Sequence, residues 1–222
     1  MIINNDVWVV IPAYNEENKI KDVIDKTKEY VQNIVLVDDG SKDNTINIAK
    51  ETGIKALRHV VNLGKGSALK TGCEFALRKE AKQLIAIDAD GQHDPAEIPN
   101  FLEALKESDI VFGYRKLTKD MPFVLRFGNW FISRAVGLLF GINLRDTQSG
   151  YRAFSADTYK KIKWDAQDYY VESEMIANAG KNRLKYKEIP IQTIYSDKYK
   201  GTTIFDGMKI VLKMIWWKFM RW

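Results

Sequence analysis

Short apolar runs alternate with helical patterns along the first half of the chain. Each run is apolar throughout, as is typical of strands that helices cover on both faces. Five strands are expected, at residues 7–11, 34–37, 54–57, 84–87 and 110–112. Helical patterns lie between them, at residues 16–30, 44–51, 67–79 and 95–107. This alternation predicts an α/β fold in which a mainly parallel sheet is sandwiched by helices.

The second half of the chain is less regular. Helices are expected at residues 127–140, 170–179 and 208–222, a strand at 184–195, and a polar turn leading into a short segment at 146–154. No linker-like stretch interrupts the chain, and 222 residues of 45% hydrophobic composition suffice for one large domain. We therefore expect one domain over residues 1–204 and a basic, aromatic, amphipathic helix over residues 205–222.

Polar, glycine-rich segments follow the expected strands. They are Pro12-Ala13-Tyr14-Asn15-Glu16, Asp38-Asp39-Gly40-Ser41, Asn62-Leu63-Gly64-Lys65-Gly66, Asp88-Ala89-Asp90-Gly91-Gln92 and Gly113-Tyr114-Arg115. In open parallel sheets, ligands bind beyond the carboxyl ends of the strands. These segments therefore predict a ligand site that is rich in carboxylates.

An apolar run leads directly into Asp88, and Asp90 and Gln92 follow at alternate positions. In an extended segment alternate side chains share a face, so three oxygen-bearing side chains are expected to converge. Such oxygens suit Mg²⁺ or Mn²⁺, and a divalent cation can neutralise a diphosphate leaving group as a Lewis acid. The alternative is a solvated turn, and Asp94 before Pro95 is itself expected to cap the next helix.

Two further segments suit a nucleotide. One carboxylate of Asp38-Asp39 could accept hydrogen bonds from a base or ribose, although Asp39-Gly40 also suits a simple turn. The Asn62–Gly66 segment offers backbone N–H groups and the Lys65 cation at a helix start, which suits a phosphate. Its spacing is not that of a Walker A loop.

Charge and cysteine content narrow the choice of partners and compartment. The single cysteine, Cys73, cannot form an intrachain disulfide, so a reducing compartment is expected. The net charge is +5, and the last 28 residues hold six basic and two acidic side chains, a net +4. A basic end predicts an anionic partner, either nucleic acid or a membrane surface. Nucleic acid is disfavoured, because the basic and aromatic residues occupy one terminal segment without a base-reading module.

The terminal segment is expected to lie on a membrane rather than cross it. Spanning a bilayer takes about 20 apolar residues, and basic side chains interrupt this segment repeatedly. Its aromatic residues, interspersed with lysines, suit an interfacial helix on anionic lipid. We expect a cytoplasmic protein, peripheral on the cytoplasmic membrane face. The alternatives are a helix docked on the protein's own core and a chain cut before a lost membrane anchor.

Taken together and in this order, the polar segments resemble those of the family 2 glycosyltransferases with the GT-A fold. The match extends over residues 7–203 and includes Asp88-Ala89-Asp90-Gly91-Gln92-His93 and Asp146-Thr147-Gln148-Ser149-Gly150-Tyr151-Arg152. Within that family the chain looks like the dolichyl- and polyprenyl-phosphate sugar transferases, including mannose synthases and archaeal hexosyltransferases. The resemblance implies a metal-dependent glycosyltransferase, with Mg²⁺ or Mn²⁺ as cofactor.

The resemblance also implies roles on the donor side. The residues implied to line the nucleoside pocket are Pro12, Ala13, Tyr14 and Glu16, with Asp39 on the base or ribose. Asp88, Asp90 and Gln92 would hold the metal and the diphosphate, and Lys65 would bind donor phosphate. Glu172 or Glu174 would face the sugar.

On the acceptor side the resemblance implies that Arg115 and Arg126 bind a phosphate. Lys198 is a further candidate, because a phosphate acceptor needs cations to hold it beside the donor diphosphate. A phosphate monoester is already nucleophilic near neutral pH, so it needs no strong general base. The segment 198–204 departs from the acceptor loop of mannose synthases, since lysine replaces arginine, threonine replaces serine and isoleucine replaces the last lysine.

The expected function is therefore an inverting transfer of a hexose, from GDP-mannose or a UDP-hexose, to dolichyl or polyprenyl phosphate. A same-fold transferase acting on a glycan or another hydroxyl acceptor is the first alternative, and it would need an aspartate base near the metal. A nucleotide-sugar binding module without turnover is the second. The sequence leaves the sugar and the base open.

Overall fold

The computed structural model describes residues 3–115, 123–168, 170–192, 211–216 and 218–219. Within these ranges seven strands form one sheet, in the order β3-β2-β1-β4-β6-β5-β7. The strands are β1 (Ile3–Ala13), β2 (Val31–Asp38), β3 (Lys55–Arg58), β4 (Gln83–Ala86), β5 (Ile110–Arg115), β6 (Arg152–Ser155) and β7 (Tyr186–Ile191). The helices are α1 (Ile20–Lys28), α2 (Thr45–Glu51), α3 (Lys65–Arg78), α4 (Ile98–Leu105), α5 (Phe123–Phe140), α6 (Ala156–Ile162) and α7 (Val171–Lys181), with a 3-10 turn, η1 (Pro95–Glu97).

The sheet is mainly parallel, as expected, and one inner strand is reversed. The pairs β1–β2, β2–β3, β1–β4 and β5–β7 are parallel. Strand β6 runs antiparallel to both of its neighbours, so Arg152 pairs with Ala86 of β4 and with Phe112 of β5. The reversed strand was expected only as a short segment after a polar turn. Its amino end therefore lies at the sheet edge where the parallel strands β1, β2 and β4 end.

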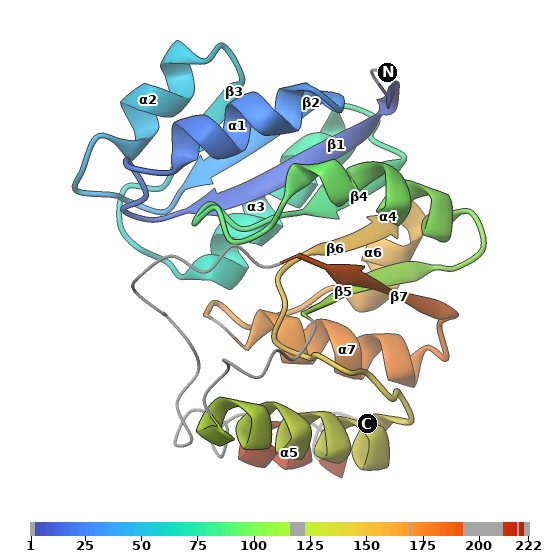
Figure 1. Cartoon of the computed structure of the whole chain (residues 1–222). Helices are drawn as coiled ribbons and strands as arrows, with labels where there is room; N and C mark the ends of the chain where they lie inside the picture. The colour runs from blue at the N-terminus through green and yellow to red at the C-terminus, as the bar shows by residue number, and fades with distance from the viewer. Residues whose placement is uncertain (1–2, 116–122, 169, 193–210, 217, 220–222) are drawn as a thin grey trace.

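Helices cover both faces of the sheet and enclose two cores. Figure 1 shows α1 and α4 in front of the sheet, α3 and α6 behind it, and α7 and α5 below. Successive residues of β1 alternate between the cores, with Val9 in the front one and Val10 in the rear one. Both are fully buried. This burial on both faces is the reason that the strands are apolar throughout.

Several element boundaries differ from the expected ones. The first helix begins at Ile20 rather than at residue 16, because the polar segment after β1 continues as a loop. The helix expected over 95–107 is divided into η1 and α4. Asp94 caps η1 as expected, since its side chain accepts a hydrogen bond from the N–H of Ala96 at 3.0 Å and Pro95 occupies the first position. Helix α6 was not anticipated.

The C-terminal segment is helical over residues 211–216 and 218–219. The expected division between residues 204 and 205 lies outside the described residues. Met214 is fully buried in the same core cluster as Ile132 and Val136 of α5, so one side of this helix docks on the protein. Its other side is apolar and open to solvent at Leu212, Ile215, Trp216 and Phe219. Over the part of the chain that is described, every helix is too short or too polar to cross a membrane.

Candidate active site

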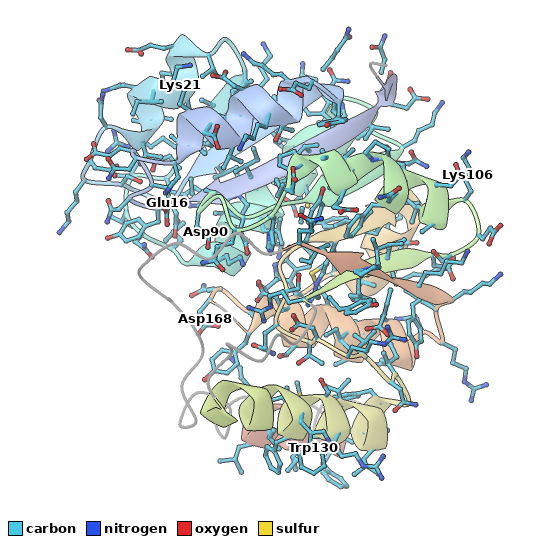
Figure 2. All side chains as sticks on the ribbon, in the orientation of Figure 1. Glu16, Lys21, Asp90, Lys106, Trp130 and Asp168 are labelled. Atoms are coloured by element: carbon cyan, nitrogen blue, oxygen red, sulfur yellow. The ribbon has the colours of Figure 1, made fainter. Side chains whose placement is uncertain are left out.

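The polar segments meet at the sheet edge where β1, β2 and β4 end. Strand β6 runs the other way, so the segment before it, residues 146–151, reaches the same edge. Figure 2 shows Glu16, Asp90 and Asp168 on this side of the molecule, toward which the arrows of β1 and β2 point. The rule that ligand sites form beyond the carboxyl ends of strands therefore applies to this sheet.

The two segments that follow β1 and β2 are locked together by hydrogen bonds. The N–H of Asn15 donates to Ser41 Oγ at 2.9 Å, and the N–H of Glu16 donates to Thr45 Oγ1 at 2.9 Å. Asn15 adopts a left-handed conformation, with φ 56°. Pro12 and Ala13 are buried at the end of β1, whereas Tyr14 is 40% exposed. Of these three predicted pocket residues, Tyr14 is therefore the one whose side chain is open to solvent.

The two adjacent aspartates after β2 have different surroundings. Asp39 is 2% exposed, and its oxygens accept from the N–H groups of Leu63 at 2.9 Å and Gly64 at 2.8 Å. A hydrogen bond of 2.7 Å also joins Asp39 Oδ1 to His59 Nδ1. Asp39 therefore fastens the segment that leads into α3. Asp38 Oδ2 lies 3.2 Å from Arg58 Nε, without an aligned hydrogen bond among the described residues.

The segment that opens α3 packs tightly against the chain before α7. The N–H of Ser67 donates to Gln167 O at 3.1 Å, and Trp164 Nε1 donates to Gly66 O at 2.9 Å. A Cβ atom on Gly66 would lie 2.1 Å from Ala166 O, so glycine is required for this close approach. The backbone on either side of Lys65 is thereby held in place.

Lys65 bridges two carboxylates that come from different elements. Its Nζ lies 2.7 Å from Asp88 Oδ1, at the end of β4, and 2.7 Å from Glu172 Oε1, in α7. All three side chains are largely buried. Burial disfavours the ammonium form, but Asp88 and Glu172 outweigh it and hold the pKa of Lys65 well above its usual range. Burial likewise opposes ionisation of Asp88, yet Lys65 keeps the pKa of that carboxyl below its ordinary value.

The chain turns after Asp88, which corrects the expectation of an extended segment through Asp90 and Gln92. Gly91, at φ 72°, supplies the left-handed residue that the turn needs. Asp90 Oδ1 accepts the N–H of Gln92 at 3.0 Å. Within the described ranges, no three His, Cys, Asp or Glu side chains cluster as a ready-made metal site. Metal binding by Asp88, Asp90 and Gln92 stays a prediction.

His93 is buried beside this turn. Its Nδ1 lies 3.8 Å from Asp88 Oδ2, and its ring packs against Tyr151 with the ring centroids 5.4 Å apart. Burial lowers the pKa of His93, although Asp88 acts in the opposite direction. The His93 ring is therefore neutral at physiological pH and packs between Asp88 and Tyr151.

Arg115, at the end of β5, is held by Asp146. Its Nε lies 2.6 Å from Asp146 Oδ2 and its Nη2 lies 3.1 Å from Asp146 Oδ1, a two-point contact. Burial opposes ionisation of Asp146, but Arg115 keeps the pKa of this carboxyl below its usual range. Among the other predicted acceptor cations, Arg126 lies in α5 with its side chain outside the described residues, and Lys198 lies wholly outside them.

Glu172 and Glu174 have separate roles, although they are two residues apart in α7. Glu172 faces Lys65, as described above. Glu174 Oε2 instead accepts from the N–H groups of Asp165 at 3.2 Å and Ala166 at 2.8 Å. Glu174 therefore fixes the chain against which the Lys65 segment packs. Of the two, Glu172 is the one that reaches the site.

Two residues of the Asp146–Arg152 segment received no individual role from the sequence. A Cβ atom on Gly150 would lie 2.5 Å from both carboxylate oxygens of Asp88, so only glycine fits there. Arg152 is 2% exposed and donates to the carbonyl oxygens of Thr147 at 3.1 Å, Ser149 at 3.1 Å and Glu172 at 2.7 Å. Burial lowers the pKa of Arg152 to about 10, so the side chain stays charged at neutral pH. The sequence signal that could have identified Arg152 is a charged residue at the start of a buried strand.

Known proteins resemble the chain over most of its length. The family model described as "Glycosyl transferase family 2" matches residues 8–191. The UDP-N-acetylglucosamine–dolichyl-phosphate N-acetylglucosaminyltransferase of Methanococcus voltae is 35% identical, with 94% of each chain covered. The undecaprenyl-phosphate mannosyltransferase of Micrococcus luteus is 27% identical, with 97% of this chain and 96% of the relative covered.

Solved structures agree on the fold. The glucosyl-3-phosphoglycerate synthase of Mycobacterium tuberculosis, in complex with Mn²⁺, uridine diphosphate and glucosyl-3-phosphoglycerate, superposes with a TM-score of 0.70. It is 20% identical, and the match covers 94% of this chain and 79% of that one. The likeness supports the GT-A fold that the sequence predicted. With the family model covering most of the chain, the protein belongs to glycosyl transferase family 2 and is a glycosyltransferase.

Proposed function

We propose that this glycosyltransferase moves a hexose from a nucleotide-sugar to a polyprenyl phosphate, with inversion at the anomeric carbon. The observation that carries the acceptor class is the state of the site carboxylates. Glu172 is paired with Lys65 and Asp146 with Arg115, while Asp88 and Asp90 are the proposed metal ligands. A hydroxyl acceptor needs a carboxylate free to take its proton, whereas a phosphate arrives already anionic.

The relatives support the same acceptor class. One relative is named for transfer to dolichyl phosphate and the other for transfer to undecaprenyl phosphate. Their donors differ, since one name specifies UDP-N-acetylglucosamine and the other a mannosyl group. The donor of this chain is therefore proposed only as a nucleotide-sugar, with GDP-mannose and UDP-hexoses as the candidates.

On the donor side, the residues proposed to bind the nucleoside are Pro12, Ala13, Tyr14, Glu16 and Asp39. Asp39 already accepts three hydrogen bonds from the protein, so any contact it makes to a base or ribose uses its remaining acceptor site. Lys65 is proposed to bind donor phosphate. A compact ammonium on a flexible stem suits this, because it can change partners without moving the backbone.

Asp88, Asp90 and Gln92 are proposed to hold Mg²⁺ or Mn²⁺. The fit rests on the donor set, since hard cations prefer carboxylate and amide oxygens, and Asp88 is ionised at neutral pH. The related synthase of known structure binds Mn²⁺ together with uridine diphosphate. When bound, the cation would stabilise the negative charge of the departing nucleoside diphosphate. Lys65, at 2.7 Å from Asp88, adds a second positive charge on this side.

On the acceptor side, Arg115, Arg126 and Lys198 are proposed to bind the lipid phosphate. A phosphate oxygen forms the new bond to the anomeric carbon while the bond to the donor diphosphate breaks, and the nucleoside diphosphate leaves. Attack opposite the leaving group inverts the anomeric centre. Asp146 holds the Arg115 guanidinium by two contacts, so this cation is oriented before the acceptor arrives.

A donor screen tests the proposed function. Purified protein is mixed with a short polyprenyl phosphate and Mn²⁺ or Mg²⁺, and with GDP-mannose, UDP-glucose or UDP-N-acetylglucosamine. Sugar is expected in the lipid phase with one of these donors, and the product should carry the inverted configuration by NMR. A parallel reaction supplies a soluble glycan in place of the lipid phosphate. Transfer to the glycan alone would favour the hydroxyl-acceptor alternative and exclude the lipid proposal.

The apolar outer faces of α5 and of the helical residues 211–216 and 218–219 are proposed to rest on a membrane. Leu138 of α5 is 74% exposed and Phe219 is 76% exposed, while Lys213 and Lys218 supply positive charge. This combination suits the surface of an anionic bilayer, where apolar side chains enter the lipid and lysines meet the headgroups. The association would be peripheral, and we propose the cytoplasmic face because the single cysteine predicts a reducing compartment.

Co-sedimentation with vesicles of anionic phospholipid tests the membrane face. Replacing Leu138 or Phe219 by glutamate is expected to release most of the bound protein, because a charge in the lipid contact is costly. Val60 is 97% exposed just after β3, which Figure 1 shows at the opposite end of the molecule from α5, so Val60→Glu is the matched control and should bind like the parent protein. Equal binding by all three variants would contradict this face.

A further inference from the structure

The Lys65 ammonium lies where a divalent cation would have to approach Asp88. It is 2.7 Å from Asp88 Oδ1 and 2.7 Å from Glu172 Oε1, so the two carboxylates share one positive charge. Gly150 closes the space on another side, since a Cβ atom there would meet both oxygens of Asp88 at 2.5 Å. An incoming cation therefore meets a carboxylate that is confined on one side and already paired.

Electrostatic repulsion opposes the binding of both Lys65 and a metal ion to Asp88. Two positive charges a few ångströms apart repel each other even at the effective dielectric of a protein surface, and a divalent ion doubles the repulsion. A metal ion alone thus competes with Lys65 for Asp88. A nucleoside diphosphate changes the balance, because its phosphate oxygens offer Lys65 a new partner and bring negative charge for both cations.

The backbone around Lys65 is fixed by hydrogen bonds. Only the Lys65 side chain can therefore move from Asp88 to a phosphate. Asp39 holds the N–H of Gly64 at 2.8 Å, and Gln167 O holds the N–H of Ser67 at 3.1 Å. Trp164 binds the carbonyl of Gly66 at 2.9 Å. The lysine stem can swing from Asp88 toward a phosphate while its Cα stays in place.

We propose that Lys65 is an internal placeholder cation: it occupies Asp88 until a nucleoside diphosphate draws it away, while it stays beside Glu172, so the metal ion binds together with the donor. The proposal rests on the proposed metal site. It assigns Lys65 a second role beside phosphate binding, namely to keep the metal affinity of the donor-free protein low. It also assigns Glu172 a role, since this carboxylate retains the lysine near the site.

Binding of Mn²⁺, measured by electron paramagnetic resonance of the free ion, tests the proposal without turnover. The parent protein is titrated alone and with saturating UDP or GDP. Affinity for Mn²⁺ is expected to rise at least about tenfold with one of the diphosphates, which corresponds to about 1.4 kcal/mol. Lys65→Met is expected to bind Mn²⁺ alone at least about tenfold more tightly than the parent, and to lose most of the gain from the diphosphate.

Matched variants separate the placeholder from a general charge effect. Lys79 is exposed just beyond the far end of the same helix, so Lys79→Met removes an equal charge and should leave Mn²⁺ binding unchanged. Lys65→Arg keeps the charge and should bind Mn²⁺ alone as weakly as the parent. Thermal unfolding gives a second readout, since Mn²⁺ without nucleotide should raise the melting temperature of Lys65→Met more than that of the parent.

Each result decides between the two proposals. Equal Mn²⁺ affinity of the parent with and without a diphosphate would overturn the placeholder and leave the metal site standing, even if Lys65→Met failed to fold. Absence of Mn²⁺ binding by the parent under every condition would overturn the metal site and the placeholder together. Tight Mn²⁺ binding by both Lys65→Arg and Lys65→Met would show that charge at this position does not control the metal.

Discussion

Replacing Asp88 by asparagine is expected to lower the rate of sugar transfer by about 10³-fold, the upper range for loss of one electrostatic contact to a developing charge. The amide has nearly the same shape, so the space beside Gly150 stays filled. It removes the negative charge that Lys65 neutralises and that the proposed metal needs. Single-turnover assays at saturating donor and Mn²⁺ measure the chemical step directly.

A matched Asp→Asn change controls for this experiment. Asp25 pairs with Lys21 on the exposed side of α1, and its side chain is about half exposed. Asp25→Asn is expected to keep the parent rate, because an exposed pair of this kind contributes little. A rate for Asp88→Asn within about threefold of the parent would contradict the assignment of Asp88 to the donor diphosphate, since one lost electrostatic contact normally costs far more.

Replacing Arg152 by methionine is expected to produce the largest loss of stability. The buried carbonyl oxygens of Thr147 and Ser149 lose their donor, and that of Glu172 loses Arg152 but stays within helix α7. Each orphaned acceptor costs about 1–3 kcal/mol, and relief from burying the charge offsets part of the sum, so a net loss of about 3 kcal/mol is expected. For a chain of this length that corresponds to a fall of roughly 6–12 °C in melting temperature.

Thermal unfolding followed by circular dichroism checks this value. Arg78→Met, at the exposed carboxyl end of α3, removes the same side chain from the surface and should change the melting temperature by at most about 2 °C. A similarly small change for Arg152→Met would mean that the three carbonyls find other partners. The segment 147–149 would then be less dependent on Arg152 than its contacts indicate.

The first half of the fold could be predicted because its strands, apart from the edge strand β3, are buried on both faces. Continuous apolar runs separated by helical patterns leave few alternatives to a parallel sheet, and the sheet in turn locates the ligand edge. Strand β6 could not be predicted in the same way. It begins with the charged Arg152 and ends with Ser155, so it lacks the continuous apolar run that marks β1, β2 and β4.

The sequence indicated which segments meet at the candidate site, but not which side chains contact one another. The sequence places Lys65 and Asp88 at the same sheet edge, but their contact depends on how α3 packs, which local patterns do not specify. The turn at Gly91 broke the expected alternation of Asp88, Asp90 and Gln92, because one left-handed glycine redirects the chain. Glu172 and Glu174 could not be separated by sequence, since two positions in a helix point about 200° apart and either could face the site.

The opposite edge of the sheet, where helices lead back into strands, suits site-specific attachment of a label or linker. Glu80 lies there between α3 and β4, exposed and already left-handed at φ 63°. Cys73, the only cysteine of the chain, is buried, and burial raises the pKa of its thiol. A cysteine introduced at position 80 would therefore take a maleimide dye or a surface linker selectively. Immobilised through it, the protein would present its catalytic edge to solution and to lipid.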